Sequence, residues 1–149
     1  MRADPRARAA VLGLLLGCSG PAAACTVATT PVAFGSINPL TQRTADGVGS
    51  IRIACPEATA YTLSIAASSG DAGAAGARRL GDDGRGIDYQ LYADAARRQV
   101  WGDGTGGTST AHGTADAAGT EHTVYGRAFP RPETRAGHYS GTLLITIAY

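Results

Sequence analysis

The stretch Gly141-Thr-Leu-Leu-Ile-Thr-Ile-Ala-Tyr149 closes the sequence and decides the predicted fold. Successive side chains of a β-strand point to opposite faces, so every second residue of this stretch falls on one face. That face carries a row of large apolar side chains: Leu143, Ile145, Ile147 and Tyr149. Such a strand is typical of a sheet interior, yet no turn and no partner strand follow it. We therefore expect an open sheet edge here, which is a template for a strand of another chain.

The beginning of the sequence has the order of a secretory signal peptide. Three arginines lie within residues 1–8, a short apolar run covers residues 9–17, and small residues lead to Ala22-Ala-Ala24. The apolar run is too short to span a bilayer as a helix. We expect cleavage after Ala24, so residues 1–24 are the predicted signal peptide and residues 25–149 the mature domain. A lipoprotein signal ending at Cys18 is the alternative.

The mature domain of 125 residues is long enough for one modest hydrophobic core. It has ten arginines against eleven acidic residues and contains no lysine. A nearly neutral chain with scattered arginines argues against nucleic-acid binding, which depends on a basic stripe. No further apolar run in the sequence is long enough to span a membrane.

The mature domain keeps two cysteines, Cys25 and Cys55, which are 30 residues apart. Two cysteines in an exported domain most often form one disulfide bond. A metal or redox pair is the alternative, but neither a CxxC motif nor a cysteine–histidine spacing supports it. We therefore expect a structural disulfide.

Apolar residues of the mature domain recur with a period of two, which predicts an all-β sandwich. Six strands are expected: 25–34, 50–55, 60–66, 87–92, 121–129 and 138–149. A seventh short strand has room within 36–48 or 108–120. The segment 66–77 consists almost entirely of small residues and is predicted to be a loop. One helical turn at 94–98 is the only helix that the pattern permits.

The sequence offers little catalytic chemistry. The glycine-rich stretch 101–108 lacks the Gly-Lys-Ser/Thr ending of a phosphate-binding loop and favours a tight turn covered by Trp101. Asp82, Asp83 and Asp88 lie among glycines and favour a solvated turn over a calcium site, because no regular ligand spacing is present. The three histidines are far apart and are expected at the surface. We expect no enzyme, no cofactor and no metal.

An ordered set of motifs nevertheless resembles the spore coat protein U domain, a family that includes archaic (Csu-type) chaperone–usher pilus subunits and secreted coat proteins. The resemblance covers nearly the whole mature domain, and its specificity lies in the order of individually weak pieces. Those pieces are Cys-Thr-Val (25–27), Val-Ala-Phe-Gly (32–35), Cys55, Tyr61-Thr-Leu, Arg78-Arg-Leu80, Ile87-Asp-Tyr-Gln-Leu-Tyr-Ala-Asp-Ala-Ala-Arg97, Val-Trp-Gly-Asp-Gly-Thr-Gly (100–106), Tyr125-Gly-Arg-Ala-Phe-Pro130 and Ala136-Gly-His-Tyr-Ser-Gly-Thr-Leu (136–143).

The resemblance implies an immunoglobulin-like sandwich of about six strands that lacks its final strand. A periplasmic chaperone, and later the N-terminal extension of another pilin subunit, supplies the missing strand in such pilins. By this analogy the last strand, with Leu143, Ile145, Ile147 and Tyr149, lines an open acceptor groove. Cys25 and Cys55 match the disulfide positions of the family. The implied partners are a periplasmic chaperone, an outer-membrane usher and other pilin subunits, and the implied location is the periplasm and then the cell surface.

One departure from the pilin pattern concerns the donor segment. Cleavage after Ala24 leaves no extension ahead of Cys25, and residues 18–24 contain no row of large alternating side chains. We therefore expect a subunit that accepts a strand without donating one, as at the tip of a fibre. Its candidate surface-contact residues are Tyr92, Trp101 and Phe129, and the alternative is that these aromatic residues belong to the core.

Two other function classes fit the sequence. One is a secreted coat or matrix protein that assembles without a chaperone and usher. The other is a soluble periplasmic binding domain, for a ligand such as a sugar, that uses the loop at Trp101. The first class differs from the pilus hypothesis in its neighbouring genes, and the second predicts a closed and stable monomer.

Overall fold

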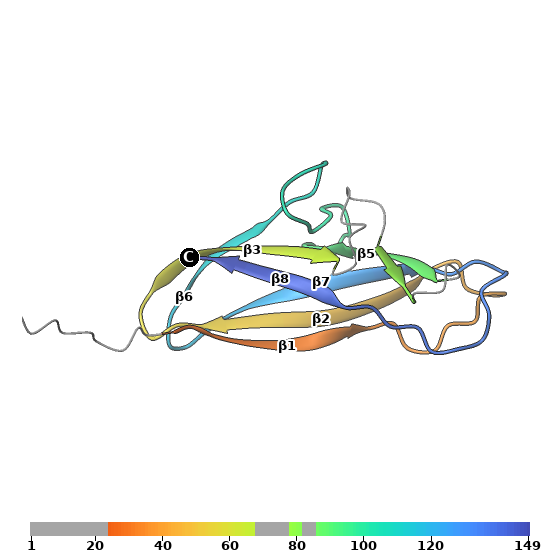
Figure 1. Ribbon diagram of the computed structural model, residues 1–149, viewed down its shortest axis with the longest axis horizontal. Coiled ribbons are helices and arrows are strands. Elements are labelled where there is room, and N and C mark those ends of the chain that lie inside the picture. Colours follow the sequence, from red (N-terminus) through yellow and green to blue (C-terminus); the bar gives the residue numbers. More distant parts are fainter. Residues whose placement is uncertain (1–23, 68–77, 82–85) are drawn as a thin grey trace, which may run out of the picture.

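The computed structural model describes residues 24–67, 78–81 and 86–149, which form eight β-strands and no helix (Figure 1). In chain order the strands are β1 (Thr26–Ala33), β2 (Ala45–Ala54), β3 (Thr59–Ala67), β4 (Arg78–Leu80), β5 (Ile87–Tyr92), β6 (Ala111–Ala115), β7 (Thr120–Phe129) and β8 (Leu143–Ala148). No helix in the described ranges has the length and apolar character needed to cross a membrane.

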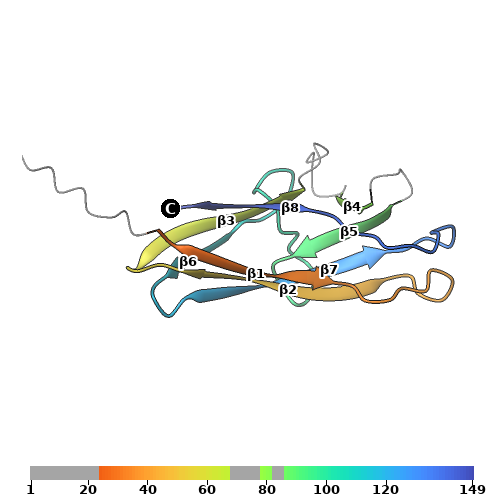
Figure 2. The same cartoon turned by 60° about the horizontal axis from the view of Figure 1, so that its bottom comes forward.

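The strands form two antiparallel sheets that pack into a sandwich (Figures 1 and 2). The larger sheet has the order β1-β2-β7-β5-β4, and the smaller sheet has the order β6-β3-β8. The all-β sandwich predicted from the period of two is therefore confirmed. Six strands were too few, because β4 and β6 were not predicted as strands, although β6 lies inside the 108–120 segment that left room for one.

The first half of β2 was not predicted, because small residues occupy the positions at which a buried strand usually has large apolar side chains. β2 begins at Ala45, five residues before the predicted start at Ser50, and its inward positions there are Gly47 and Gly49. A Cβ atom on Gly49 would lie 2.6 Å from the carbonyl oxygen of Thr30, so the close approach of β1 requires glycine. The strand therefore exists without the apolar pattern that predicts one.

The core lies between the two sheets and consists of the inward-facing residues of both. Ile53 and Leu91 from the larger sheet and Leu63 from the smaller sheet are fully buried. The other buried hydrophobic residues are Ala45, Ile51, Cys55, Tyr61, Ile65, Leu80, Ile87, Tyr89, Trp101, Ala115, Val124 and Ala128. Burial of this apolar surface is the main force that holds the sheets together.

One side of the sandwich is closed by backbone and side-chain bonds between the sheets. The N–H of Ile65 in β3 donates to the carbonyl oxygen of Gly102 at 3.2 Å. The buried guanidinium of Arg78 in β4 donates to the carbonyl oxygens of Ile65, at 2.9 Å, and Trp101, at 2.5 Å, and to the Gln90 side chain at 2.7 Å. Arg78 thus acts in place of a strand, because it satisfies carbonyl groups at the edge of the smaller sheet.

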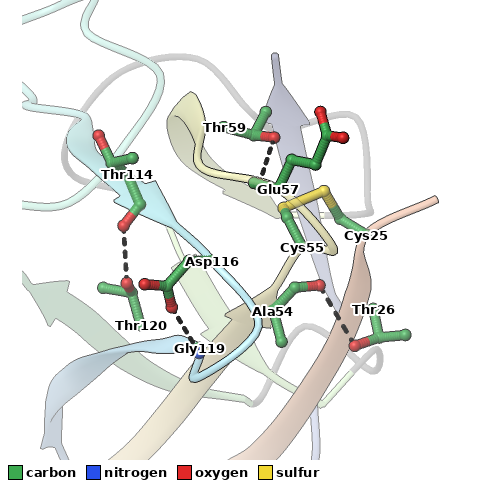
Figure 3. The surroundings of a disulfide bond; sticks show 10 residues. All are labelled: Cys25, Thr26, Ala54, Cys55, Glu57, Thr59, Thr114, Asp116, Gly119 and Thr120. Atoms are coloured by element: carbon green, nitrogen blue, oxygen red, sulfur yellow. Dashed lines mark hydrogen bonds between the residues drawn. A yellow bond between two sulfur atoms is a disulfide. The ribbon is translucent and has the colours of Figure 1, made fainter. Parts of the chain in front are cut away.

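A disulfide bond between Cys25 and Cys55 fixes the start of β1 to the end of β2 (Figure 3). The Thr26 hydroxyl donates to the carbonyl oxygen of Ala54 beside it, at 3.4 Å. The N–H of Cys55 donates to the carbonyl oxygen of Asp116 in the turn between β6 and β7, at 3.0 Å. The disulfide therefore anchors β1, an edge strand of the larger sheet, at its N-terminal end.

Two predictions about loops have different outcomes. The segment 94–98 is a turn in which the N–H of Arg97 donates to the carbonyl oxygen of Asp94 at 3.0 Å, and it does not form a helix. Most of the predicted loop 66–77 lies outside the described residues, while its first two residues belong to β3.

Replacing both cysteines by serine should lower the free energy of unfolding by about 3–4 kcal/mol, because the 30-residue separation sets the loop entropy that the disulfide removes from the unfolded chain. Urea unfolding of the oxidised chain and of the Cys25→Ser/Cys55→Ser variant measures this difference. Equal unfolding midpoints would show that the bond does not stabilise the domain.

Replacing Arg78 by methionine should lower the free energy of unfolding by about 2–6 kcal/mol, because two buried carbonyl groups lose their donor at about 1–3 kcal/mol each. Arg79 is the matched control, since it is the next residue, has an exposed side chain and pairs with Asp88. Arg79→Met should cost less than about 1 kcal/mol. Equal shifts of the two urea midpoints would contradict the role assigned to Arg78.

Candidate functional site

Two strand edges on the side opposite Arg78 have no partner within the described chain. β8 pairs with β3 alone, and β1 pairs with β2 alone, so each is the last strand of its sheet. The two strands run in opposite directions, and the end of β8 lies at the same end of the sandwich as the start of β1 (Figures 1 and 2). Each edge presents backbone N–H and C=O groups that are available for pairing.

An apolar groove of about 310 Å³ lies between these two strands. Its walls come from β1, with the residue that follows it, and from β8, with the two residues that precede it. Its floor comes from the inward faces of both sheets. The lining residues are Thr29, Thr30, Pro31, Val32, Phe34, Ser50, Ile51, Ile65, Leu80, Tyr89, Leu91, Val124, Gly141, Thr142, Leu143 and Ile145.

The inward face of β8 carries the residues that the sequence predicts for a groove wall. Leu143, Ile145 and Ile147 are half-buried and pack against the core, whereas Leu144 on the opposite face is 57% exposed. Leu143 and Ile145 line the groove. Ile147 lies beyond it, and Tyr149 follows the strand with 65% of its surface exposed. That these four residues serve subunit assembly stays a prediction.

The β1 wall shows that the interior of the sandwich is uncovered here. Val27 lies directly opposite Ile53 in the pairing of β1 with β2, and directly opposed residues share a face of the sheet. Ile53 is fully buried, yet Val27 is 46% exposed. An inward-facing valine remains exposed because no strand formed by the described residues covers this part of the core.

The sequence did not predict the groove-lining residues outside β8. Phe34, which follows β1, makes an edge-to-face contact with Tyr89 of β5, with ring centroids 6.0 Å apart. Burial raises the pKa of the Tyr89 hydroxyl, which therefore stays neutral at physiological pH. Leu91 and Val124 complete the apolar surface from β5 and β7. These residues are inward positions of separate strands, so only the tertiary fold brings them together.

A family model of the spore coat protein U domain matches residues 19–146 of the sequence. The chain belongs to the spore coat protein U domain family. The resemblance carried by the ordered motifs is therefore confirmed at the level of the family. No curated protein matches the chain in sequence.

The fold of this spore coat protein U domain is similar to one in a solved pilus complex. That crystal structure is of the CsuC–CsuE chaperone–tip adhesion subunit pre-assembly complex from archaic chaperone–usher Csu pili of Acinetobacter baumannii. The TM-score is 0.53 and the sequence identity is 16%, over 85% of this chain. The match spans 39% of the length of that chain. At this identity the similarity concerns the fold alone.

The three candidate surface-contact residues of the domain have different environments. Trp101 is 1% exposed, and its indole N–H donates to the carbonyl oxygen of Leu63 at 3.3 Å, so its assignment to a surface contact is wrong. The glycine-rich turn after it misled the prediction, because the tryptophan itself fills the core. Tyr92 is half-buried and Phe129 is 38% exposed. A contact role for these two stays a prediction.

No group of three or more histidine, cysteine or acidic side chains is placed to hold a metal ion within the part of the chain that the structure describes. Two of the three aspartates considered as calcium ligands, Asp82 and Asp83, lie outside the described residues. The carboxylate of Asp88 is paired with two arginines, Arg79 at 3.0 Å and Arg131 at 2.6 Å.

His122 lies between the sheets, whereas the sequence analysis placed it at the surface. It is opposite the buried Ile51 in the pairing of β2 with β7. Its Nε2 is 2.6 Å from the Tyr61 hydroxyl oxygen, and its ring packs edge-to-face on Tyr61 and on Trp101, at centroid distances of 5.7 and 5.9 Å. A Cβ atom on Gly113 would lie 2.6 Å from that hydroxyl oxygen. The alternation along β7 could have predicted this, because His122 lies two residues before the inward-facing Val124 and therefore shares its face of the strand.

Burial lowers the pKa of His122 from its ordinary value of 6.5. The unfolded chain therefore binds a proton at a higher pH than the folded chain does, so stability should fall as the pH drops below 6.5 and level off below the folded-state pKa. Melting temperatures at about pH 7.5 and about pH 5 measure this loss. His122→Gln should reduce the difference between the two temperatures, while His138→Gln, at an exposed position, should leave it unchanged. A pH dependence that His122→Gln does not alter would contradict the assignment.

Proposed function

We propose that this chain is an exported structural subunit that assembles by donor-strand complementation into an archaic chaperone–usher pilus or a similar surface structure. The observation that carries the proposal is the apolar groove between the unpaired edges of β1 and β8. A strand laid into this groove pairs its backbone with both edges and places every second side chain on the apolar floor.

The energetics of the groove support a bound strand. Each large apolar side chain that a donated strand buries there contributes about 1.5–3 kcal/mol. Two or three such side chains rival the ~5–15 kcal/mol net stability of a small domain. We therefore expect the uncomplemented subunit to be marginally stable and prone to aggregate, and the complemented subunit to be stable.

The proposed partners are a periplasmic chaperone, an outer-membrane usher and other pilin subunits. Membership of the spore coat protein U domain family and the fold similarity to a chaperone–tip subunit complex support this choice. The Cys25–Cys55 disulfide is in keeping with an exported protein. Export through a signal peptide of residues 1–24 is part of the proposal, and we propose no catalytic role.

The finer proposal is that the subunit accepts a strand without donating one. It depends on processing after Ala24 or at Cys18, because neither leaves a row of large alternating side chains ahead of Cys25. N-terminal sequencing of the protein recovered from the periplasm or the cell surface tests it. A mature chain that retains a long alternating apolar segment ahead of Cys25 would contradict it.

The two other function classes differ in their support. A secreted coat protein belongs to the same family, and the absence of chaperone and usher genes beside this gene would favour it. A binding site for sugar built on Trp101 is disfavoured, because that side chain is buried and its indole N–H already bonds to Leu63.

Ile145→Asn should abolish formation of a one-to-one complex with a periplasmic chaperone that binds the wild-type chain, because the polar amide would face the apolar groove. Leu144→Asn is the matched control, since Leu144 is the preceding residue of β8 and is 57% exposed on the opposite face. It should retain the complex. Co-expression followed by affinity purification of the chaperone measures both.

The same experiment separates a groove defect from a folding defect. The wild-type chain should be recovered with the chaperone as a complex that protects β8 from proteolysis, and should aggregate when it is expressed alone. A wild-type chain that is as stable alone as it is with a bound strand would overturn the proposed function. Equal loss of the complex in both variants would show that the groove-facing side of β8 is not what binds the chaperone, so the groove would no longer support the proposed function.

A further inference from the structure

The outer face of the larger sheet, which points away from the acceptor groove, carries two clusters in which two arginines share one aspartate. The Asp46 cluster consists of Asp46 on β2, Arg127 on β7 and Arg97 from the turn after β5. The Asp88 cluster consists of Asp88 on β5, Arg79 on β4 and Arg131 after β7. Each cluster carries one positive charge in excess.

The Asp46 cluster is held in a fixed arrangement. Arg127 binds both carboxylate oxygens of Asp46 through Nε and Nη2, at 2.7 and 2.9 Å, so its Nη1 takes no part in the pair. Arg97 Nη2 lies 3.4 Å from the same carboxylate, and its guanidinium carbon lies 5.9 Å from the centroid of the Tyr125 ring. Arg97 has a φ of 55°, the left-handed region that a non-glycine residue rarely adopts. The backbone therefore accepts strain in the turn that holds this arginine over the sheet.

The Asp88 cluster presents its arginines to solvent. Asp88 Oδ1 accepts from Arg79 Nε at 3.0 Å, and Oδ2 accepts from Arg131 Nη2 at 2.6 Å. The arginine side chains are 42% and 60% exposed. Each guanidinium donates one of its five N–H groups to Asp88, so both arginines retain donors for a further acceptor.

The two clusters are neighbours on one surface and border a row of aromatic rings. Arg127 and Phe129 share the outer face of β7, and Phe129 lies directly opposite Asp88. Tyr92 and Tyr125 lie opposite each other on the same face, four residues after Asp88 in β5 and four residues before Phe129 in β7. The face thus combines guanidinium groups of excess positive charge with half-buried phenol rings.

We propose that this face binds an acidic polysaccharide that carries regularly spaced carboxylates. Guanidinium groups bind carboxylates with two parallel hydrogen bonds, and aromatic rings offer flat apolar surface to the C–H face of a sugar ring. A nucleic acid fits less well, because its dense phosphates call for a continuous basic stripe, whereas this face interrupts its arginines with aspartates. The site goes beyond strand acceptance and occupies the opposite side of the sheet.

The test is calorimetric titration of the full chain with polygalacturonate, with neutral dextran of matched length as the reference ligand. A bound donor strand keeps the chain in solution where the chain alone aggregates, and the same donor strand is used for every variant. Polygalacturonate should bind, and its affinity should fall with added salt. Arg79→Gln/Arg131→Gln should weaken binding by about tenfold or more, because two charge-assisted contacts are lost. Arg43→Gln/Arg135→Gln, at two exposed positions outside both clusters, removes the same charge and should change the affinity by less than about twofold.

Three results would overturn the proposal. They are no binding of polygalacturonate at low salt, equal binding of dextran, and equal weakening by the two double variants, which would show attraction to net charge alone. Tighter binding of single-stranded DNA of matched charge would instead assign the face to a nucleic acid and also overturn it. If Arg79→Gln/Arg131→Gln unfolds, Asp88→Asn added to it removes the unpaired carboxylate and serves as the variant. None of these results depends on the acceptor groove.

Discussion

The rest of the structure depends on one constraint: on one side of the sandwich, the edge strands β1 and β8 have no strand paired between them in the described chain. β8 pairs with β3 and β1 pairs with β2, and in the described chain nothing bridges these two edges. The side chains respond to this gap. Val27 faces inward like Ile53 but stays exposed, and the inward residues of β8 are only half-buried. The apolar groove therefore lies where the described chain leaves two strand edges without a partner.

The opposite side of the sandwich shows how a comparable edge is closed within one chain. There the carbonyl oxygen of Gly102 accepts a hydrogen bond from the N–H of Ile65 in β3. The Arg78 guanidinium donates to the carbonyl oxygens of Ile65 and Trp101. A buried arginine is a costly device, and it works here because three oxygen atoms accept its hydrogen bonds. The contrast between the closed and open sides argues that the groove is a specific feature of the fold. It is also the reason that we assign assembly to one side and polysaccharide binding to an outer face.

Sequence reasoning recovered the elements whose inward positions carry large apolar side chains. β5 was predicted with its observed bounds, and β8 was recognised from its alternating leucine and isoleucine residues. β6 and the first half of β2 were missed because their positions are filled by alanine, glycine and polar residues. At Gly49 and Gly113 a side chain would collide with Thr30 and Tyr61, so tertiary contacts chose these residues and the local pattern does not reveal them. His122 was placed at the surface because its burial comes from contacts with Tyr61 and Trp101, and Trp101 was misassigned because a glycine-rich turn follows it.

Backbone amide hydrogen exchange of β1 and β8 tests the central claim most directly. In the chain without a bound strand, the amides of these two strands that point away from β2 and β3 should exchange rapidly, while the inner strands β2, β3 and β7 stay protected. Addition of a strand donor should slow exchange along both edges together. Protection of both edges in the unliganded monomer would contradict the account, because it would mean that the chain completes its own sandwich.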